Sequence, residues 1–192
     1  MYKFFLLSIL FCILLSCTQL DDSGLIADDN GVLHRTIHYL KDQRGRNYFP
    51  KKIPATGSKQ FIFDPQAYAW AAYDANGQRI MTGAASGGQD FCQDVGQPCR
   101  TVPGIFRIYN KKDINCRSGE FPVETVGGAK MPYCMYFYRG YTIHAAFEVP
   151  NRNSSHGCVR VFPSAAKWLN EEFMVLGTKV IILPYADYQH PL

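Results

Sequence analysis

Short apolar and aromatic runs separated by turn-forming residues begin at residue 60, and this pattern restricts the fold more than any other feature. Two such runs, Gln60–Phe63 and Tyr68–Tyr73, are followed by Asn76-Gly77, the strongest short signal for a β-hairpin. The hairpin predicts that Arg79–Ala84 is the returning strand. Further runs of this kind occupy Ile105–Asn110, Met131–Tyr138, Tyr141–Phe147 and Val180–Leu183. The chain is therefore predicted to be mainly β.

One clear helix is expected near the C-terminal end. Ser164 is a suitable N-cap for a helix through Phe173, and Gly177 ends it. With 192 residues and 47% hydrophobic composition, the chain is large enough for one domain with a real core. Residues 32–59 are harder to assign. A helix can begin at Leu33, which would place His34 and His38 on one face, but as a metal pair they lack a third ligand and a solvated face is favoured.

The N-terminal residues are typical of an exported protein. Lys3 precedes the apolar segment Phe4–Leu15, whose only polar member is Ser8. As a helix this segment would rise about 18 Å, too little for a hydrocarbon core of about 30 Å. A positive start, a short apolar centre and a small residue at position 16 predict a signal peptide over residues 1–16.

The sequence Leu14-Leu15-Ser16-Cys17 resembles a bacterial lipoprotein signal, in which the cysteine is acylated and becomes the mature N-terminus. Leu15 departs from that pattern, which prefers a smaller residue. Thr18 stands where an aspartate would retain a lipoprotein in the inner membrane, so a lipid-anchored protein on the periplasmic side of the outer membrane is expected in an organism that has one, and otherwise in the cell envelope. Residues 17–57 would then be the lipidated cysteine and a tether. Simple cleavage and a soluble secreted protein is the alternative.

Seven cysteines are present, of which Cys12 leaves with the signal peptide and Cys17 is used if it is lipidated. Five remain, an odd number in an oxidising compartment. Five cysteines with one left free allow fifteen pairings. We expect two short disulfides and one free thiol, while reduced thiols or metal binding remain the alternative. The expected pairs are Cys92 with Cys99 and Cys116 with Cys134, and the expected free thiol is Cys158.

The candidate chemistry lies in His144 and in the run Ser155-His156-Gly157-Cys158-Val159-Arg160, whose cysteine stands fourteen residues after His144. A cysteine nucleophile reacts as the thiolate, and an imidazole within hydrogen-bond reach can take its proton and return it to a leaving amine. Gly157 allows close approach of the backbone, so its N–H and that of Cys158 are candidate oxyanion donors. A zinc site made of His144, His156 and Cys158 would lack a fourth ligand and would not have the spacing that is usual for zinc.

This block resembles the YkuD family of L,D-transpeptidases, which carries a His, a variable loop and then Ser/Thr-His-Gly-Cys, an apolar residue and Arg or Asn. Upstream, Thr101–Phe106 is similar to the family's Thr-Pro-x-Gly-x-Phe/Tyr stretch with one residue inserted, and Met131–Tyr133 to its Met-Pro-aromatic strand. The resemblance covers residues 58–184, the expected catalytic domain, with 185–192 as a tail. It implies a β-sandwich or β-barrel-like domain with one main helix. A likeness to the enhanced-entry lipoprotein subgroup is weaker.

The resemblance also implies roles for individual residues. Cys158 would be the nucleophile, His144 the proton donor and acceptor, and Gly157 an oxyanion donor. The remaining expected site residues are His156, which tunes the site, and Arg160, Ser155 and Tyr133, which contact substrate. Arg160 would meet a substrate carboxylate, since a guanidinium pairs with two carboxylate oxygens at once. The group that orients His144 would be the backbone oxygen of Ala145.

The implied activity is transpeptidation of peptidoglycan stem peptides through an acyl-thioester, without a cofactor or metal. Water as acceptor would make the protein an L,D-carboxypeptidase, and a non-catalytic peptidoglycan-binding lipoprotein is a further alternative. The formal net charge of +4 is mild and no Lys/Arg stripe with interleaved aromatics occurs, so nucleic-acid binding is not expected. A monomer attached to the membrane through its lipid is expected.

Overall fold

The computed structural model describes residues 25–27, 33–35 and 44–186. The predicted signal peptide, the lipidation site Cys17 and most of the tether lie outside these residues. A two-stranded antiparallel sheet is formed by β1 (Leu25–Ala27) and β2 (Leu33–Arg35). Residues 33–35 are therefore a strand, and the predicted helix start at Leu33 is wrong. No helix in the described part of the chain is long and apolar enough to cross a membrane.

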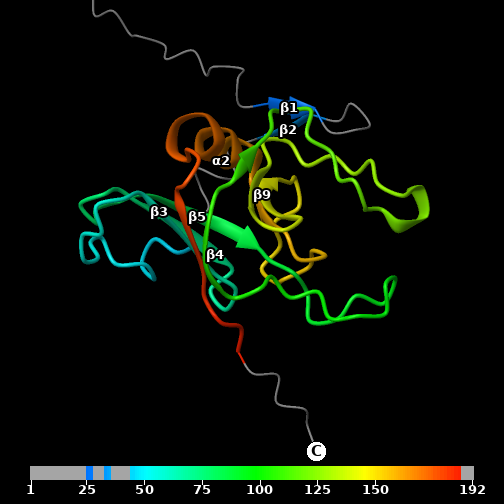
Figure 1. The fold of residues 1–192 in the computed structure, drawn as a ribbon, viewed down its shortest axis with the longest axis horizontal. Helices are drawn as coiled ribbons and strands as arrows, with labels where there is room; N and C mark the ends of the chain where they lie inside the picture. The colour runs from blue at the N-terminus through cyan, green and yellow to red at the C-terminus, as the bar shows by residue number, and fades with distance from the viewer. Residues whose placement is uncertain (1–24, 28–32, 36–43, 187–192) are drawn as a thin grey trace, which may run out of the picture.

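The domain is built on one nine-stranded sheet with the order β6-β11-β3-β4-β5-β10-β9-β8-β7. The predicted hairpin at Asn76-Gly77 joins β4 to β5 in antiparallel register, and Figure 1 shows both strands in the lower half of the molecule. The strands are β3 (Gln60–Asp64), β4 (Ala69–Tyr73), β5 (Arg79–Ser86), β6 (Gly104–Arg107), β7 (Asn110–Lys111), β8 (Met135–Tyr138), β9 (Tyr141–Ala145), β10 (Val159–Val161) and β11 (Lys179–Ile182).

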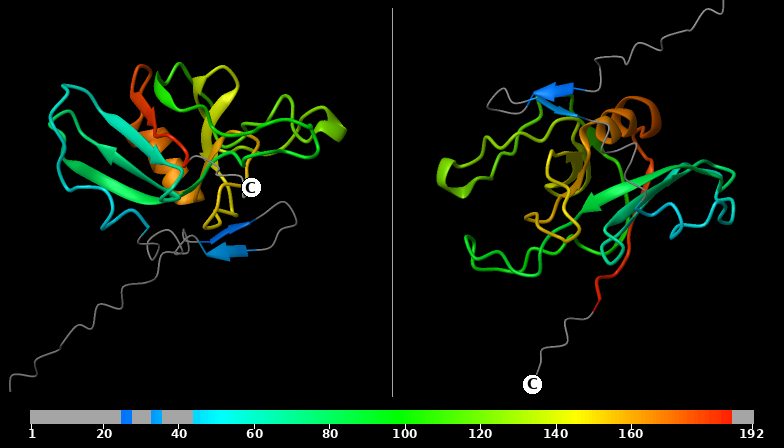
Figure 2. Two further views of the ribbon diagram at one scale, coloured as in Figure 1. Left: turned by 90° about the horizontal axis from the view of Figure 1, so that it is seen from below. Right: turned by 180° about the vertical axis from the view of Figure 1, so that it is seen from behind.

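The sheet curls, because strands from its two edges meet across the core. Phe106 on β6 packs against Phe137 and Tyr138 on β8, with ring centroids 5.5 and 5.0 Å apart. The long strand β5 links the halves, pairing with β4 over its first part and with β10 through Ala85 and Ser86. The structure is thus mainly β with one main helix, as predicted, and the two views in Figure 2 show the curled sheet around that helix.

The helical segment consists of α2 (Pro163–Trp168) and the continuing π-helical turn η3 (Leu169–Phe173). It begins two residues earlier than predicted: Phe162 instead of Ser164 is the N-cap, and Pro163 takes the first helical position, where its missing N–H costs nothing. Ala165, Ala166 and Leu169 are fully buried in the main core, where the helix packs against β9 and β10. The helix therefore covers one face of the strands that carry the candidate nucleophile and base.

Two predicted strands are shorter than expected. The run predicted from Met131 forms a strand only from Met135, because Tyr133 has a positive φ of 58° and the preceding residues form a turn. The run Ile105–Asn110 divides between β6 and β7. Between them and β8, a loop with a short 3-10 turn, η2 (Val123–Thr125), projects from the domain on the same side as the loop around residues 90–99 (Figure 1).

Candidate active site

The parallel pairing of β9 with β10 brings the candidate catalytic residues together. Arg160 lies opposite His144, and Val159 lies opposite Ile143, which places Cys158 beside Thr142. Because side chains alternate along a strand, Val159 and Ile143 enter the core while the other side chains share the opposite face. That face carries Thr142 and His144 from β9, Arg160 from β10 and Cys158 from the residue directly before β10.

Cys158 is the one free cysteine in the described part of the chain, and it is half-buried. The hydroxyl of Thr142 donates a hydrogen bond to its Sγ at 3.4 Å. Burial raises the pKa of the Cys158 thiol, while hydrogen bonds from Thr142 and the charge of Arg160 act in the opposite direction. The thiol is therefore held mainly in its neutral form, with a donor already in place for the thiolate.

His144 is buried, with 7% of its surface exposed. Its pKa is lowered from 6.5 to about 4, mainly by burial, while a hydrogen bond with Ala145 raises it and the charge of Arg160 adds to the lowering. The ring Nδ1 lies 2.8 Å from the backbone oxygen of Ala145. Since a carbonyl oxygen only accepts, Nδ1 carries the proton and Nε2 is left as the acceptor. The structure thus places the predicted orienting oxygen beside a neutral imidazole, the form a general base requires.

The loop before the nucleophile is fixed by the Ser155 hydroxyl. This group donates to the Cys158 carbonyl at 2.5 Å and accepts the Gly157 N–H at 3.1 Å. Ser155 is 2% exposed, so its hydroxyl organises the loop, and its predicted contact with substrate stays a prediction. The Gly157 N–H is occupied by this bond, and its predicted role as an oxyanion donor is not supported. The Cys158 N–H has no hydrogen-bond partner in the described part of the chain and is the remaining candidate.

Gly157 is required by its own geometry. It adopts φ of 120°, and a Cβ there would lie 2.6 Å from the ring of Tyr141. A side chain at this position would be strained and would displace the tyrosine. The backbone directly before Cys158 therefore has a conformation that only glycine adopts without strain.

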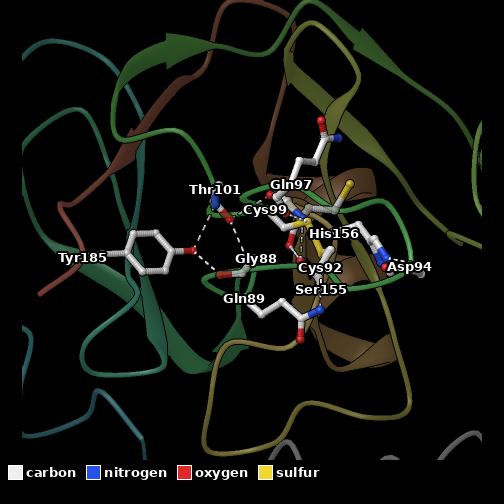
Figure 3. The surroundings of a disulfide bond; sticks show 12 residues. Gly88, Gln89, Cys92, Asp94, Gln97, Cys99, Thr101, Ser155, His156 and Tyr185 are labelled. Carbon is white, nitrogen blue, oxygen red and sulfur yellow. Dashed lines mark hydrogen bonds and ion pairs between the residues drawn. A yellow bond between two sulfur atoms is a disulfide. The ribbon is translucent and has the colours of Figure 1, made fainter. Parts of the chain in front are cut away.

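The predicted tuning residue His156 is directed to the loops around the site. Its Nε2 lies 2.6 Å from a carboxylate oxygen of Asp94, and its ring lies 4.4 Å from that of Phe121, centroid to centroid. The hydrogen bond to His156 lowers the pKa of Asp94. His156 thus joins the loop bearing Asp94 to the loop bearing Phe121, as Figure 3 shows for the first contact.

Both loops are closed by disulfides. The structure joins Cys92 to Cys99 and Cys116 to Cys134, which are the two pairs predicted from the sequence. Cys116 and Cys134 are buried in a small cluster against which Cys158 itself packs. Cys92, Asp94 and His156 lie close enough to hold a metal ion, but the sulfur of Cys92 is bonded to Cys99 and cannot act as a thiolate ligand.

Arg160 and Tyr133, the other two residues predicted to contact substrate, lie in different surroundings. Arg160 is half-buried, its pKa is lowered by burial, and the charges of Cys158 and Glu148 oppose that shift. It lies opposite His144 in the parallel strand pair. Tyr133 stands in the turn before β8 and is half-buried, packed against the main core, with its N–H donating to Asp113. It serves this turn, and no contact in the structure directs it to the thiol.

Three residues near the site were missed in the sequence: Thr142, Thr101 and Tyr185. Thr142 could have been found from the alternation of β9, because it lies two residues before His144 on the same strand face. Thr101 donates to the Gly157 carbonyl. Its place in the motif Thr101–Phe106 indicated that it matters to the family, but not that it contacts the loop before the nucleophile. Tyr185 donates to Gly88, although it lies beyond the predicted domain boundary at residue 184, and nothing in the sequence indicates that contact.

Comparisons with known proteins give one family and one fold. The model of the YkuD L,D-transpeptidase catalytic domain matches residues 58–182. An L,D-transpeptidase from Xylanimonas cellulosilytica is similar with a TM-score of 0.59 and 26% identity, covering 71% of this chain and 65% of that chain. One from Stackebrandtia nassauensis has a TM-score of 0.56 and 22% identity, covering 74% and 63%.

L,D-transpeptidase 3 from Mycobacterium tuberculosis, solved in complex with a faropenem-derived adduct, has a TM-score of 0.54 and 18% identity, covering 66% of this chain and 60% of that chain. The present chain thus spans less than two thirds of each of these solved chains. A comparison with curated proteins found no match.

Proposed function

Because the chain belongs to the YkuD family of L,D-transpeptidase catalytic domains, we propose that it is a cysteine-dependent L,D-transpeptidase acting on peptidoglycan stem peptides. The observation that carries this proposal is the placement of a free thiol, Cys158, on the same sheet face as a buried neutral imidazole, His144. Ala145 fixes the tautomer that leaves Nε2 as the base. A nucleophile, a base and a group that orients the base are the parts that thiol acyl transfer needs.

The first half-reaction breaks a peptide bond of the donor stem. Nε2 of His144 takes the thiol proton as Sγ of Cys158 attacks the carbonyl carbon, and the carbonyl oxygen becomes an oxyanion. The Cys158 N–H stabilises that oxyanion. The tetrahedral species collapses, the C–N bond breaks, and the leaving amine takes the proton from His144. The products are an acyl-thioester on Cys158 and a released terminal D-amino acid.

The second half-reaction removes the acyl group. An amine acceptor loses a proton to His144, attacks the thioester carbonyl and forms a new amide, while Cys158 leaves as the thiol. Water in the same place would give a carboxylic acid and make the protein an L,D-carboxypeptidase. The acceptor decides between these activities, so the two are distinguished by products: a cross-linked stem or a shortened, unlinked stem.

Arg160 binds a carboxylate of the donor stem. It stands directly opposite His144 in the parallel pair, on the face that carries Cys158. A guanidinium pairs with two carboxylate oxygens at once, so the contact sets both position and orientation. Its charge also favours the thiolate of Cys158. The same residue would therefore hold the substrate and help the nucleophile.

At the N-terminus, acylation of Cys17 after signal cleavage would place the domain on the periplasmic side of the outer membrane. The charged Lys3, the short apolar segment Phe4–Leu15 and the position of Cys17 support this proposal. Stable anchoring requires more than one acyl chain. Intact-mass analysis of the mature protein tests it: a Cys17 carrying lipid is expected, and loss of the membrane-bound fraction is expected in Cys17→Ser. An unmodified mature N-terminus would refute lipidation.

The activity is tested on separate samples of the mature domain, one analysed by intact mass after incubation with faropenem and one incubated with a tetrapeptide muropeptide. The proposal expects a covalent adduct and released D-amino acid with wild-type protein, and neither with Cys158→Ala. Cys158→Ala removes only the sulfur, so its circular dichroism spectrum should match that of the wild type and serve as the folding control. Absence of both adduct and product in the wild type would leave a non-catalytic binding protein as the answer.

A further inference from the structure

Thr101 lies behind the nucleophile, 0% exposed. Its hydroxyl donates to the carbonyl oxygen of Gly157 at 2.7 Å and accepts the N–H of Gly88 at 3.0 Å. Figure 3 shows Thr101 beside Gly88 and the phenol of Tyr185. The buried hydroxyl is thus both a donor and an acceptor, and the bond that it donates fixes the peptide group directly before Cys158.

The orientation of that peptide decides where the Cys158 N–H points. In a trans peptide the C=O bond and the following N–H bond lie in one plane and point in opposite directions. A hydrogen bond that fixes the Gly157 carbonyl toward Thr101 therefore directs the Cys158 N–H away from Thr101. This N–H has no partner among the described residues, whereas the preceding Gly157 N–H is bound to Ser155. It is the donor left for a developing oxyanion, whose stabilisation requires a donor fixed in advance.

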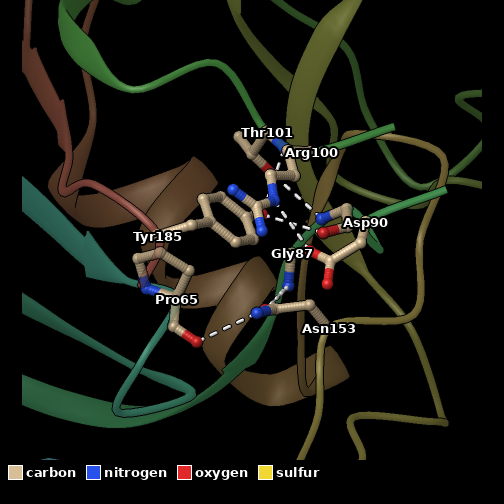
Figure 4. A network of polar contacts seen from close by, with 8 residues as sticks. Pro65, Gly87, Asp90, Arg100, Thr101, Asn153 and Tyr185 are labelled. Carbon is tan, nitrogen blue, oxygen red and sulfur yellow. Dashed lines mark hydrogen bonds and ion pairs between the residues drawn. The ribbon is translucent and has the colours of Figure 1, made fainter. Parts of the chain in front are cut away.

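Tyr185 fixes Thr101 in turn. Its phenol oxygen accepts the Thr101 N–H at 3.1 Å and donates to the Gly88 carbonyl at 2.9 Å. Arg100 stacks on the tyrosine ring, 5.1 Å from its centroid, and pairs with Asp90 at 2.7 Å. Figure 4 shows this network joining the segment after β11 to the loop after β5. One phenol therefore closes a ring of hydrogen bonds with Thr101 and Gly88.

Gly88 leaves this network little freedom. A Cβ at this position would lie 1.8 Å from the backbone oxygen of Cys99 and 2.8 Å from the Cα of Gly157. The backbones of three segments are thus in direct contact here, and a shift of Gly88 would move Gly157. Loss of either hydroxyl in the network is expected to displace the Gly157 carbonyl, without touching the sulfur of Cys158.

We propose that Thr101 and Tyr185 are positioning residues for acyl transfer, which together hold the Gly157–Cys158 peptide so that its N–H is presented to the oxyanion of the tetrahedral intermediate. The inference rests on the proposed function. Neither side chain touches the reacting atoms, so their effect is confined to reactions that pass through an oxyanion. A displacement at Cys158 that forms no oxyanion should not need them.

Two reactions of the same thiol separate these cases. Faropenem acylates Cys158 through attack on a carbonyl, whereas iodoacetamide alkylates it by direct displacement of iodide. Rate constants for both are to be measured by intact mass in wild type, Tyr185→Phe, Thr101→Val and Thr101→Ser. Loss of an oxyanion donor costs about 100- to 1,000-fold, so a misdirected donor should cost less: roughly tenfold in Tyr185→Phe and somewhat more in Thr101→Val. Alkylation should stay within about twofold, and Thr101→Ser should keep the wild-type acylation rate.

Tyr73→Phe is the matched control, because its buried phenol donates to the Pro50 carbonyl at 2.9 Å, outside this network. It should leave the ratio of acylation to alkylation unchanged. Equal losses in both reactions, or an unchanged ratio in Tyr185→Phe, would overturn the positioning role; if Thr101→Val does not fold, Tyr185→Phe decides alone. A wild-type protein that is alkylated but never acylated would instead overturn the proposed function.

Discussion

Replacing Thr142 by valine should raise the pKa of the Cys158 thiol. Valine keeps the shape of threonine but replaces the hydroxyl that donates to Sγ at 3.4 Å by a methyl group. Thr142 is 0% exposed, so bulk water does not replace the lost donor. Burial, the largest influence, already raises this pKa, and the hydroxyl opposes it. The substitution therefore removes a group that favours the thiolate and leaves the one that disfavours it.

The magnitude follows from the strength of a hydrogen bond to a charged group, about 1.5–3 kcal/mol. At about 1.4 kcal/mol for each pH unit, the pKa should rise by roughly one to two. The thiolate population at neutral pH then falls about 10- to 100-fold, and the greater nucleophilicity of a more basic thiolate offsets nearly half of that on a logarithmic scale. The alkylation rate at pH 7 should therefore fall about three- to tenfold.

The assay is the pH dependence of iodoacetamide alkylation, fitted for the pKa of Cys158. Thr142→Ser keeps the hydroxyl and is the matched control, with a pKa expected near that of wild type. Cys158→Ala defines the background. The reasoning is refuted if the valine variant has the wild-type pKa, or if the serine variant shifts by the same amount, since the hydroxyl would then have no part in the effect.

Two further predictions concern stability. The pKa of His144 is about 4 in the folded state and 6.5 in the unfolded state, so the unfolded chain binds a proton first as the pH falls. About 3 kcal/mol of stability should therefore be lost between pH 6.5 and pH 4. The free energy of unfolding measured in urea should show this dependence on pH in wild type but not in His144→Asn. Removing the bridge between Cys116 and Cys134, which are 18 residues apart, by the double serine variant should cost about 3 kcal/mol. A thiol count under denaturing conditions should find one free thiol in the mature oxidised protein; three would mean that one of the two disulfides is absent, and five that both are.

The elements that sequence alone located are those specified by local chemistry. The β4–β5 hairpin follows from Asn76-Gly77 and its apolar flanks, and the nucleophile and base follow from an ordered run of residue types. The roles of Thr142 and Tyr185 were not accessible in this way. Thr142 meets the thiol only because β9 and β10 pair in parallel with one register, and Tyr185 meets Gly88 across 97 residues. The hydrogen bonds of Ser155 within its own loop were not accessible either, because the sequence does not show which way a hydroxyl in a catalytic motif points.

Burial affects the two reacting groups so that neither is charged at rest. It raises the pKa of Cys158 and lowers that of His144 to about 4, the reverse of the order that a thiolate–imidazolium pair requires. Proton transfer must therefore accompany attack, with His144 as a general base.

Arg160 gives substrate a way to strengthen that base. Its positive charge lowers the pKa of His144, and a stem carboxylate bound to Arg160 would neutralise much of that charge. The pKa of His144 should then be higher in the substrate complex than in the free protein, which makes it the stronger base when substrate is present. Since kcat/KM reports the free enzyme and kcat the complex, the acid limb of kcat should lie at higher pH than that of kcat/KM, and Arg160→Gln should bring the two together. Coincident limbs in the wild type would refute the pairing of Arg160 with a substrate carboxylate.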